Sequence, residues 1–203
     1  ARGDEAAFGL FGAVGIHALA AQRHMHRWGT TAEQFAEVAM AARAHAARNP
    51  NAYLQEPLTM DSYRQAKYIV EPLKHPDCCL VSDGAAAVLV TAADYAVGLR
   101  KPAISILGHG QAHSFSNWSS ANHFDNLPAA RCGPEVLHKA GLTPEDIDVV
   151  QLYDCFTIVV LMQLEAYGFC KRGEGGAFVE GGRIGPGGEL PVNTRGGLLA
   201  EAY

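Results

Sequence analysis

The sequence predicts a layered α/β fold, in which helices cover sheets made of buried strands. Three short and continuous apolar runs carry the β part of this prediction, because such runs are typical of strands buried on both faces. They are Ala85–Val90, Ala103–Gly108 and Ile147–Leu152. Longer segments with apolar residues at helical spacing alternate with them along the chain. We expect Ala85–Val90 and Ile147–Leu152 to be central strands of a mixed sheet.

The first quarter of the chain is predicted to be helical. Alanine and glycine dominate one face from Ala6 to Trp28, basic residues gather near its end, and Gly29 ends the helix. Thr31 begins a second helix, because Gln34 three residues later completes a capping box. Apolar residues at helical spacing extend this second helix to about Arg48.

The middle of the chain contains a predicted boundary. Three prolines between Tyr53 and Pro76 favour loop structure, with one short helix near Asp61–Lys67. A small helix is expected at Asp94–Val97. Gly98–Pro102 then separates two apolar runs, so residues 1–99 and 100–203 are predicted to form two parts that each contribute to a sheet.

Helices and turns are predicted for the rest of the chain. Thr143 followed by Pro144 favours a short helical turn, and Phe156–Tyr167 is a predicted helix that Gly168 ends. Residues 173–188 are dense in glycine but contain neither of the glycine-rich phosphate-binding patterns. We therefore expect a set of tight turns there.

Composition excludes several classes of protein. A net charge of −5, from 16 basic and 21 acidic residues, does not favour nucleic acid or an anionic membrane as a partner. No window approaches the roughly 18 uninterrupted apolar residues of a membrane helix, which predicts a soluble protein. The five cysteines and the histidines lack metal-ligand spacing, so no metal site is expected. The cysteines are predicted to be reduced thiols, mostly packing residues, in a cytoplasmic protein.

The two ends of the sequence suggest a fragment. The chain starts at Ala1, and it ends at Tyr203 inside an apolar, helix-forming run that has no cap or turn. We therefore expect that a larger protein contains these residues.

Four segments, in order along the chain, carry a family resemblance. They are Ser82-Asp83-Gly84-Ala85-Ala86-Ala87, Tyr153-Asp154-Cys155-Phe156, Gly185-Pro186-Gly187-Gly188 and Asn193-Thr194-Arg195-Gly196-Gly197. This ordered set resembles the thiolase superfamily, in its lipid-transfer-protein-like branch, and is most similar to the aldolases that cleave the side chains of steroid acyl-CoA esters. The resemblance implies a layered α-β-α-β-α sandwich, present here as a fragment that lacks the N-terminal part. Residues 1–99 would end the N-terminal half, with its helical and loop insertion, and residues 100–203 would form an incomplete C-terminal half.

The resemblance also implies where chemistry takes place. Members with thiolase activity have a histidine at the first position of the second motif, and another ten residues after the asparagine of Asn-x-x-Gly-Gly. This sequence has Tyr153 and Tyr203 at these positions. The nucleophilic cysteine of a thiolase belongs to the part of the fold that is absent here, so none of the five cysteines takes that role.

Two tyrosines in place of two histidines favour a different reaction. A phenol with a pKa of about 10 is poorly matched to activating a thiol at neutral pH, whereas a histidine near 6.5 is suited to it. A phenol can instead take a proton transiently from a β-hydroxyl group, or donate a hydrogen bond to an enolate. Together with the resemblance, this predicts retro-aldol cleavage of a bulky, sterol-type β-hydroxyacyl-CoA into a ketone and a short acyl-CoA. Which tyrosine is the acid and which the base stays open.

Supporting residues and partners complete the prediction. Asn193 and His113 are candidates to support the reacting groups, Asn193 because its amide can hold a tyrosine or a water. Coenzyme A is expected only as part of the substrate, with no covalently bound cofactor. A homodimer is expected from the Ala/Gly-rich helix and the large apolar fraction of the sequence, and the resemblance adds a small partner protein with an OB-fold domain. Two alternatives remain: a cysteine-dependent thiolase or acetyl-CoA acyltransferase, and a non-catalytic lipid-transfer or scaffold subunit.

Overall fold

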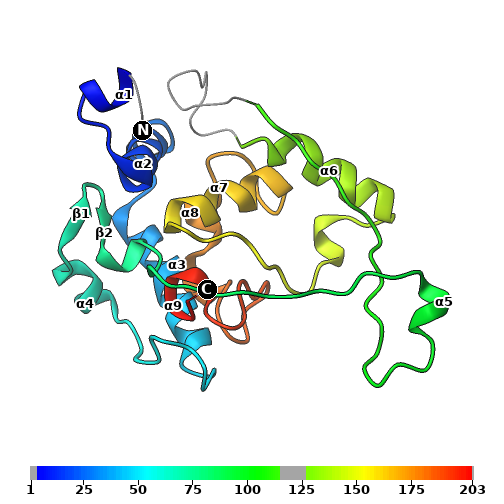
Figure 1. Cartoon of the computed structure of the whole chain (residues 1–203). Coiled ribbons are helices and arrows are strands. Elements are labelled where there is room, and N and C mark those ends of the chain that lie inside the picture. The colour runs from blue at the N-terminus through cyan, green and yellow to red at the C-terminus, as the bar shows by residue number, and fades with distance from the viewer. Residues whose placement is uncertain (1–3, 115–126, 203) are drawn as a thin grey trace.

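A computed structural model describes residues 4–114 and 127–202 of the chain. Figure 1 shows helices α7 and α8 at the centre, with α2 and α3 on one side and α6 on the other. The helices and strands, in chain order, are α1 (Asp4–Ala7), α2 (Gly12–Trp28), α3 (Ala32–Ala46), α4 (Met60–Gln65), β1 (Tyr68–Val70), β2 (Leu73–Lys74), η1 (His75–Asp77), α5 (Ala93–Ala96), α6 (Ala129–Ala140), η3 (Pro144–Asp146), α7 (Thr157–Tyr167), α8 (Gly175–Phe178), η4 (Glu180–Gly182) and α9 (Gly197–Ala200).

Helix α7 is the centre of the core. Its residues from Thr157 to Leu164 are all buried, as expected for a helix that is apolar on every side. It contacts α2, α3, α6 and α8. Gly168 ends it in the left-handed conformation, which confirms the predicted end of this helix.

The ends of the first helices follow local sequence signals. Gly29 has a φ of 74° and ends α2 as predicted. The Gln34 N–H donates to the Thr31 hydroxyl at 3.3 Å, and the Thr31 N–H donates to the Gln34 side chain at 3.1 Å, so the predicted capping box is confirmed. The predicted continuous helix from Ala6 is wrong. The chain breaks between α1 and α2, where Gly9 and Gly12 have positive φ angles.

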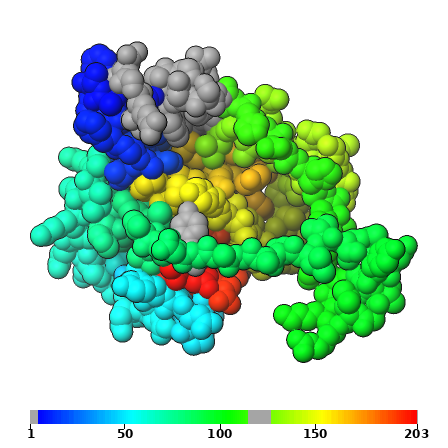
Figure 2. All heavy atoms as spheres, viewed as in Figure 1, coloured from blue at the N-terminus to red at the C-terminus, as the bar shows by residue number. Residues whose placement is uncertain are grey.

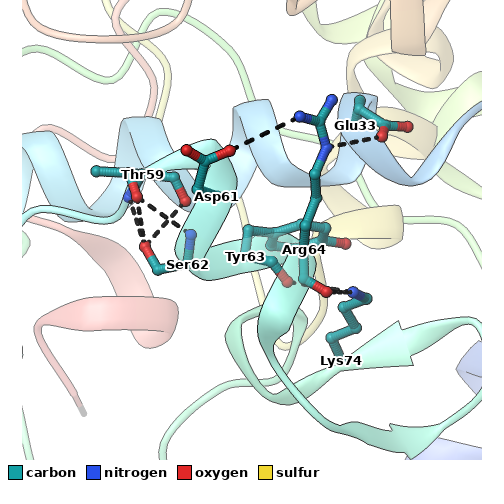
Figure 3. Close-up of polar contacts among 7 residues, drawn as sticks. All are labelled: Glu33, Thr59, Asp61, Ser62, Tyr63, Arg64 and Lys74. Atoms are coloured by element: carbon teal, nitrogen blue, oxygen red, sulfur yellow. Dashed lines mark hydrogen bonds and ion pairs between the residues drawn. The ribbon is translucent and has the colours of Figure 1, made fainter.

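Helix α4 and the hairpin after it form a small polar cluster, drawn in Figure 3. The Thr59 hydroxyl accepts from the Ser62 N–H at 3.2 Å and caps α4, whose bounds lie within two residues of those predicted. Strands β1 and β2 pair antiparallel where the sequence suggested loop. The Lys74 ammonium donates to the carbonyl oxygens of Tyr63 and Arg64 and ties β2 back to α4 (Figure 3).

Asp77 joins this cluster to the core. It is fully buried and accepts hydrogen bonds from the Tyr63 hydroxyl, the Lys74 N–H and the Thr157 hydroxyl, each at 2.8 Å. Since Thr157 is the first residue of α7, this one carboxylate connects α4, β2 and α7.

The predicted central strand at Ala85–Val90 is wrong. None of these residues is in a strand, and Leu89 is 87% exposed. Ala103–Gly108, also predicted as a buried strand, is irregular, with Ile104 90% exposed. Figure 2 shows this part of the chain, in green, crossing the surface and standing out from the body. A strand needs a neighbour for its N–H and C=O groups, and no described residue pairs with either run.

The third predicted strand is reduced to a single bridge. Within Ile147–Leu152, Val150 pairs in parallel with Val192, and the Val150 N–H donates to the Pro191 carbonyl at 3.1 Å. Val150 and Leu152 are buried whereas Val149, Gln151 and Tyr153 on either side of them are exposed, so this stretch keeps the alternation of a strand. It is not the central strand that the sequence predicts.

The glycine-dense segment and η3 agree with the sequence. Residues 173–188 form α8, η4 and tight turns, and Gly181, Gly182 and Gly187 have positive φ angles. Gly188 allows a close approach, because a Cβ there would lie 2.1 Å from the Arg183 carbonyl oxygen.

Among the described helices, none is both long and apolar enough to cross a bilayer.

Candidate active site

Tyr153 has an exposed side chain on a fixed backbone. It lies between the bridge at Val150 and the start of α7, and its side chain is 56% exposed. Its carbonyl oxygen accepts a hydrogen bond of 2.6 Å from the Gln163 side chain on α7. Tyr153 is therefore exposed, with its side chain hydrogen-bonded to Cys155, while the main chain that carries it is held by the core.

Asn193 holds the backbone immediately before Tyr153. Its side-chain oxygen accepts from the Leu152 N–H at 2.7 Å, and its amide donates to the Leu152 carbonyl at 3.0 Å. It is buried, and its φ of 52° lies in the left-handed region, which asparagine tolerates better than most residues. These bonds give Asn193 a supporting position, because they brace the main chain next to Tyr153.

Asp154 holds the backbone immediately after Tyr153, and the sequence reasoning did not single it out. It is 2% exposed and accepts from the N–H groups of Leu198 at 2.9 Å and Leu199 at 3.3 Å. Burial raises the pKa of its carboxyl, while these hydrogen bonds and one with the Asn193 side chain oppose that shift. The sequence signal that could have identified Asp154 is its place in the motif, where an acidic residue stands among apolar ones.

Tyr203, the second predicted catalytic residue, lies outside the described residues. The segment that leads to it is held at several points. The N–H groups of Leu54 and Tyr53 donate to the carbonyls of Ala200 and Glu201, and the Leu80 N–H donates to the Leu198 carbonyl. Helix α9 is thus fixed both to the 53–54 loop and to Asp154.

His113 lies on the exposed, irregular segment that follows Ala103–Gly108. Its ring nitrogen contacts the Gln111 side chain at 3.0 Å. Gly110, close by, packs against Val136 and Cys132 of α6. A supporting role for His113 stays a prediction.

The cysteines near the motif are protonated thiols. Burial raises the pKa of Cys155 to about 11 and that of Cys170 to about 12, so both are neutral at pH 7. All five cysteines are free of disulfides. A buried neutral thiol suits the packing role that the sequence predicts.

A histidine that is distant in the sequence lies next to Cys155. The Nε2 atom of His17 on α2 lies 3.9 Å from the Cys155 sulfur, and the His17 ring stacks on Phe156 with centroids 4.4 Å apart. The other ring nitrogen of His17 lies 2.7 Å from the Ala13 carbonyl. Burial lowers the pKa of His17, so this imidazole and this thiol form a neutral pair rather than an ion pair.

Two hollows of the described surface lie away from Tyr153. One, of about 710 Å³, is lined by residues of η3, α8 and the 168–171 segment, and includes Phe169 and Arg183. The other, of about 410 Å³, lies between α2 and β1 and includes Leu19 and Val70. Tyr153 lines neither. Within the described part of the chain, no group of three or more histidine, cysteine or acidic residues is arranged to hold a metal ion.

Comparisons with known proteins show what this chain is similar to. Residues 110–203 match the family described as thiolase C-terminal domain-like. The chain is 40% identical over 192 residues to the 17-hydroxy-3-oxo-4-pregnene-20-carboxyl-CoA lyase of Mycobacterium tuberculosis, a match that covers 92% of this chain and 50% of the relative. It is also 40% identical over 202 residues to the steroid side-chain-cleaving aldolase of Thermomonospora curvata, covering 97% of this chain and 52% of the relative.

A solved structure gives the same assignment. The Ltp2-ChsH2(DUF35) aldolase matches with a TM-score of 0.91 and 38% sequence identity, over 100% of this chain and 56% of that one. The chain spans about half the length of the curated relatives it matches. The sequence motifs, the fold and these comparisons agree: residues 110–203 match a thiolase C-terminal domain, and the chain has a thiolase-like α/β fold and is similar in sequence to these aldolases.

Proposed function

We propose that the whole protein cleaves a bulky, sterol-type β-hydroxyacyl-CoA by a retro-aldol reaction in the degradation of steroid side chains. The observation that carries this proposal is Tyr153, an exposed phenol on a fixed backbone at the position where thiolases of this branch have a histidine. The identity of 40% to a steroid side-chain-cleaving aldolase and to a steroid carboxyl-CoA lyase supports the same reaction.

The chemistry needs one base and one acid. The base takes the proton of the β-hydroxyl group as the bond between the α- and β-carbons breaks, which gives a ketone and the enolate of the shortened acyl-CoA. The acid then returns a proton to the α-carbon of that enolate. We assign these two transfers to Tyr153 and Tyr203, without an order between them, with Asn193 bracing the backbone beside Tyr153.

The proposal includes partners and a compartment. Coenzyme A takes part only as the thioester group of the substrate. We further propose a homodimer that associates with a small OB-fold protein, and the name of the similar Ltp2-ChsH2(DUF35) aldolase supports such a heteromer. Five cysteines without disulfides support a location in the cytoplasm.

The test uses the full-length protein together with its small partner. A steroid β-hydroxyacyl-CoA is supplied, and release of the ketone and of the short acyl-CoA is followed over time. The expected result is equal amounts of both products, and a Tyr153→Phe variant whose turnover is lower by roughly 10²–10⁴.

Two outcomes would contradict the proposal. Cleavage of a β-ketoacyl-CoA that requires free coenzyme A would instead identify a cysteine-dependent thiolase. Binding of the steroid thioester without turnover would identify a carrier or scaffold subunit.

A further inference from the structure

Asp154 is buried, whereas the residue before it is exposed. Tyr153 is 56% exposed, whereas Asp154 is 2% exposed and has its carboxylate turned to the main chain of α9. A buried carboxylate loses hydration, and burial raises the pKa of this group. The hydrogen bonds from Leu198 and Leu199 offset this cost, and both of them come from the main chain of α9.

The hydrogen bonds around Tyr153 have a common feature. The Asn193 side chain binds both backbone groups of Leu152, and the Asp154 side chain binds the backbone of Leu198 and Leu199. Residues on both sides of Tyr153 are therefore tied to one segment, 193–199. Four residues after Leu199, the same segment reaches Tyr203 in the sequence.

The fit of the carboxylate is tight. A Cβ built on Gly197 would lie 2.1 Å from the Asp154 Oδ2 atom and 2.9 Å from the Asn193 amide nitrogen. Gly197 also has a φ of 62°, a conformation that other residues rarely adopt. Any side chain at position 197 would displace the carboxylate, so this position offers a second way to disturb the same contact.

We infer that Asp154 is a positioning residue for the reaction, which fixes Tyr153 relative to the segment that carries Tyr203. It touches the main chain rather than the substrate, and it acts through the placement of the phenol. The inference rests on the proposed function. A misplacement of about 1 Å in a reacting group can lower a rate by roughly 10²-fold, which sets the size of the effect to look for.

The first experiment replaces Asp154 with asparagine in the full-length protein and its partner. The amide keeps the volume but presents an NH₂ group to one of the two backbone N–H donors. We expect kcat to fall by roughly 10–100-fold, with KM for the steroid thioester changed by less than about 2-fold. Thermal unfolding is measured in parallel, so that the rate refers to folded protein.

A matched control separates positioning from general loss of order. Glu165 is also a buried carboxylate, and it accepts from Gly175 N–H at 2.9 Å and pairs with His24 at 3.0 Å, towards the far end of α7. Glu165→Gln should lower the stability without lowering the kcat of the folded protein. If both variants lower kcat equally, the inference is wrong.

The decisive experiment is a double-mutant cycle. If Asp154 acts through Tyr153, Asp154→Asn in the Tyr153→Phe background should cost less than about 2-fold in kcat, far below its effect in the unchanged protein. The same loss in both backgrounds would overturn the inference. If Asp154→Asn does not fold, Gly197→Ala takes its place in the cycle, because it keeps the carboxylate and displaces it.

The cycle also distinguishes the inference from the proposed function. Normal turnover in Tyr153→Phe alone contradicts the catalytic role of Tyr153, whatever Asp154 does. A large loss in Tyr153→Phe, with an independent effect of Asp154→Asn, leaves the proposed function standing and overturns only the positioning role.

Discussion

Replacing Asp77 with alanine should cost the protein a large part of its stability. Three donors point at this carboxylate, each at 2.8 Å: the Tyr63 hydroxyl, the Lys74 N–H and the Thr157 hydroxyl. The Tyr63 and Thr157 side chains are 1% and 0% exposed, so water cannot easily replace the lost acceptor.

The expected magnitude follows from these contacts. A buried donor without a partner costs about 1–3 kcal/mol, and three of them would cost about 3–9 kcal/mol. The change to alanine also removes the free-energy cost of burying a charged carboxylate. The same burial raises the pKa of Asp77 in the folded protein. The lower half of the range therefore applies, and we expect Asp77→Ala to lower the free energy of unfolding by about 3–5 kcal/mol.

The assay is urea unfolding of the full-length protein followed by circular dichroism. Tyr63→Phe removes only one of the three bonds and should cost about 1–2 kcal/mol. Asp61→Ala is the matched surface control, since this carboxylate on α4 is 87% exposed and should change stability by less than about 0.5 kcal/mol. A loss below about 1 kcal/mol for Asp77→Ala, or one equal to that of Asp61→Ala, would refute the reasoning.

Three further predictions concern rate, pH and assembly. Tyr153→Phe and Tyr203→Phe should each lower turnover by roughly 10²–10⁴ with little change in melting, and the double variant should lose much less than the product of the two; near-normal rates in both single variants would refute this. Because burial lowers the pKa of His17, protons bind the unfolded state more readily just below pH 6.5, so stability should fall as the pH drops from about 6.5 through the lower folded pKa. His17→Phe keeps the stacking on Phe156 and should make urea unfolding at acidic and neutral pH more alike, whereas an unchanged pH dependence would exclude His17 as a source. Light scattering of the full-length protein should give at least a dimer, and a stable monomer would count against the expected association.

The sequence by itself determined where several helices begin and end. The Thr31 capping box, Gly29 and Gly168 each act within four residues of a helix end, so neighbouring residues contain all the information needed. The motif around Tyr153 and its likeness to a family were also readable in sequence order, because the identity of a residue does not depend on its partners.

The tertiary structure decided which residues are buried and which groups each of them contacts. Leu89 looked like part of a buried strand but is exposed, because an apolar run fixes only a preference for burial and a strand needs a neighbour to bind its backbone. Asp154 binds Leu198, 44 residues away, and the Cys155 sulfur lies near His17, 138 residues away. No local pattern encodes such pairs. They exist because α2, α3, α7 and α9 contribute to one core, and that packing brings buried polar groups to the partners they require.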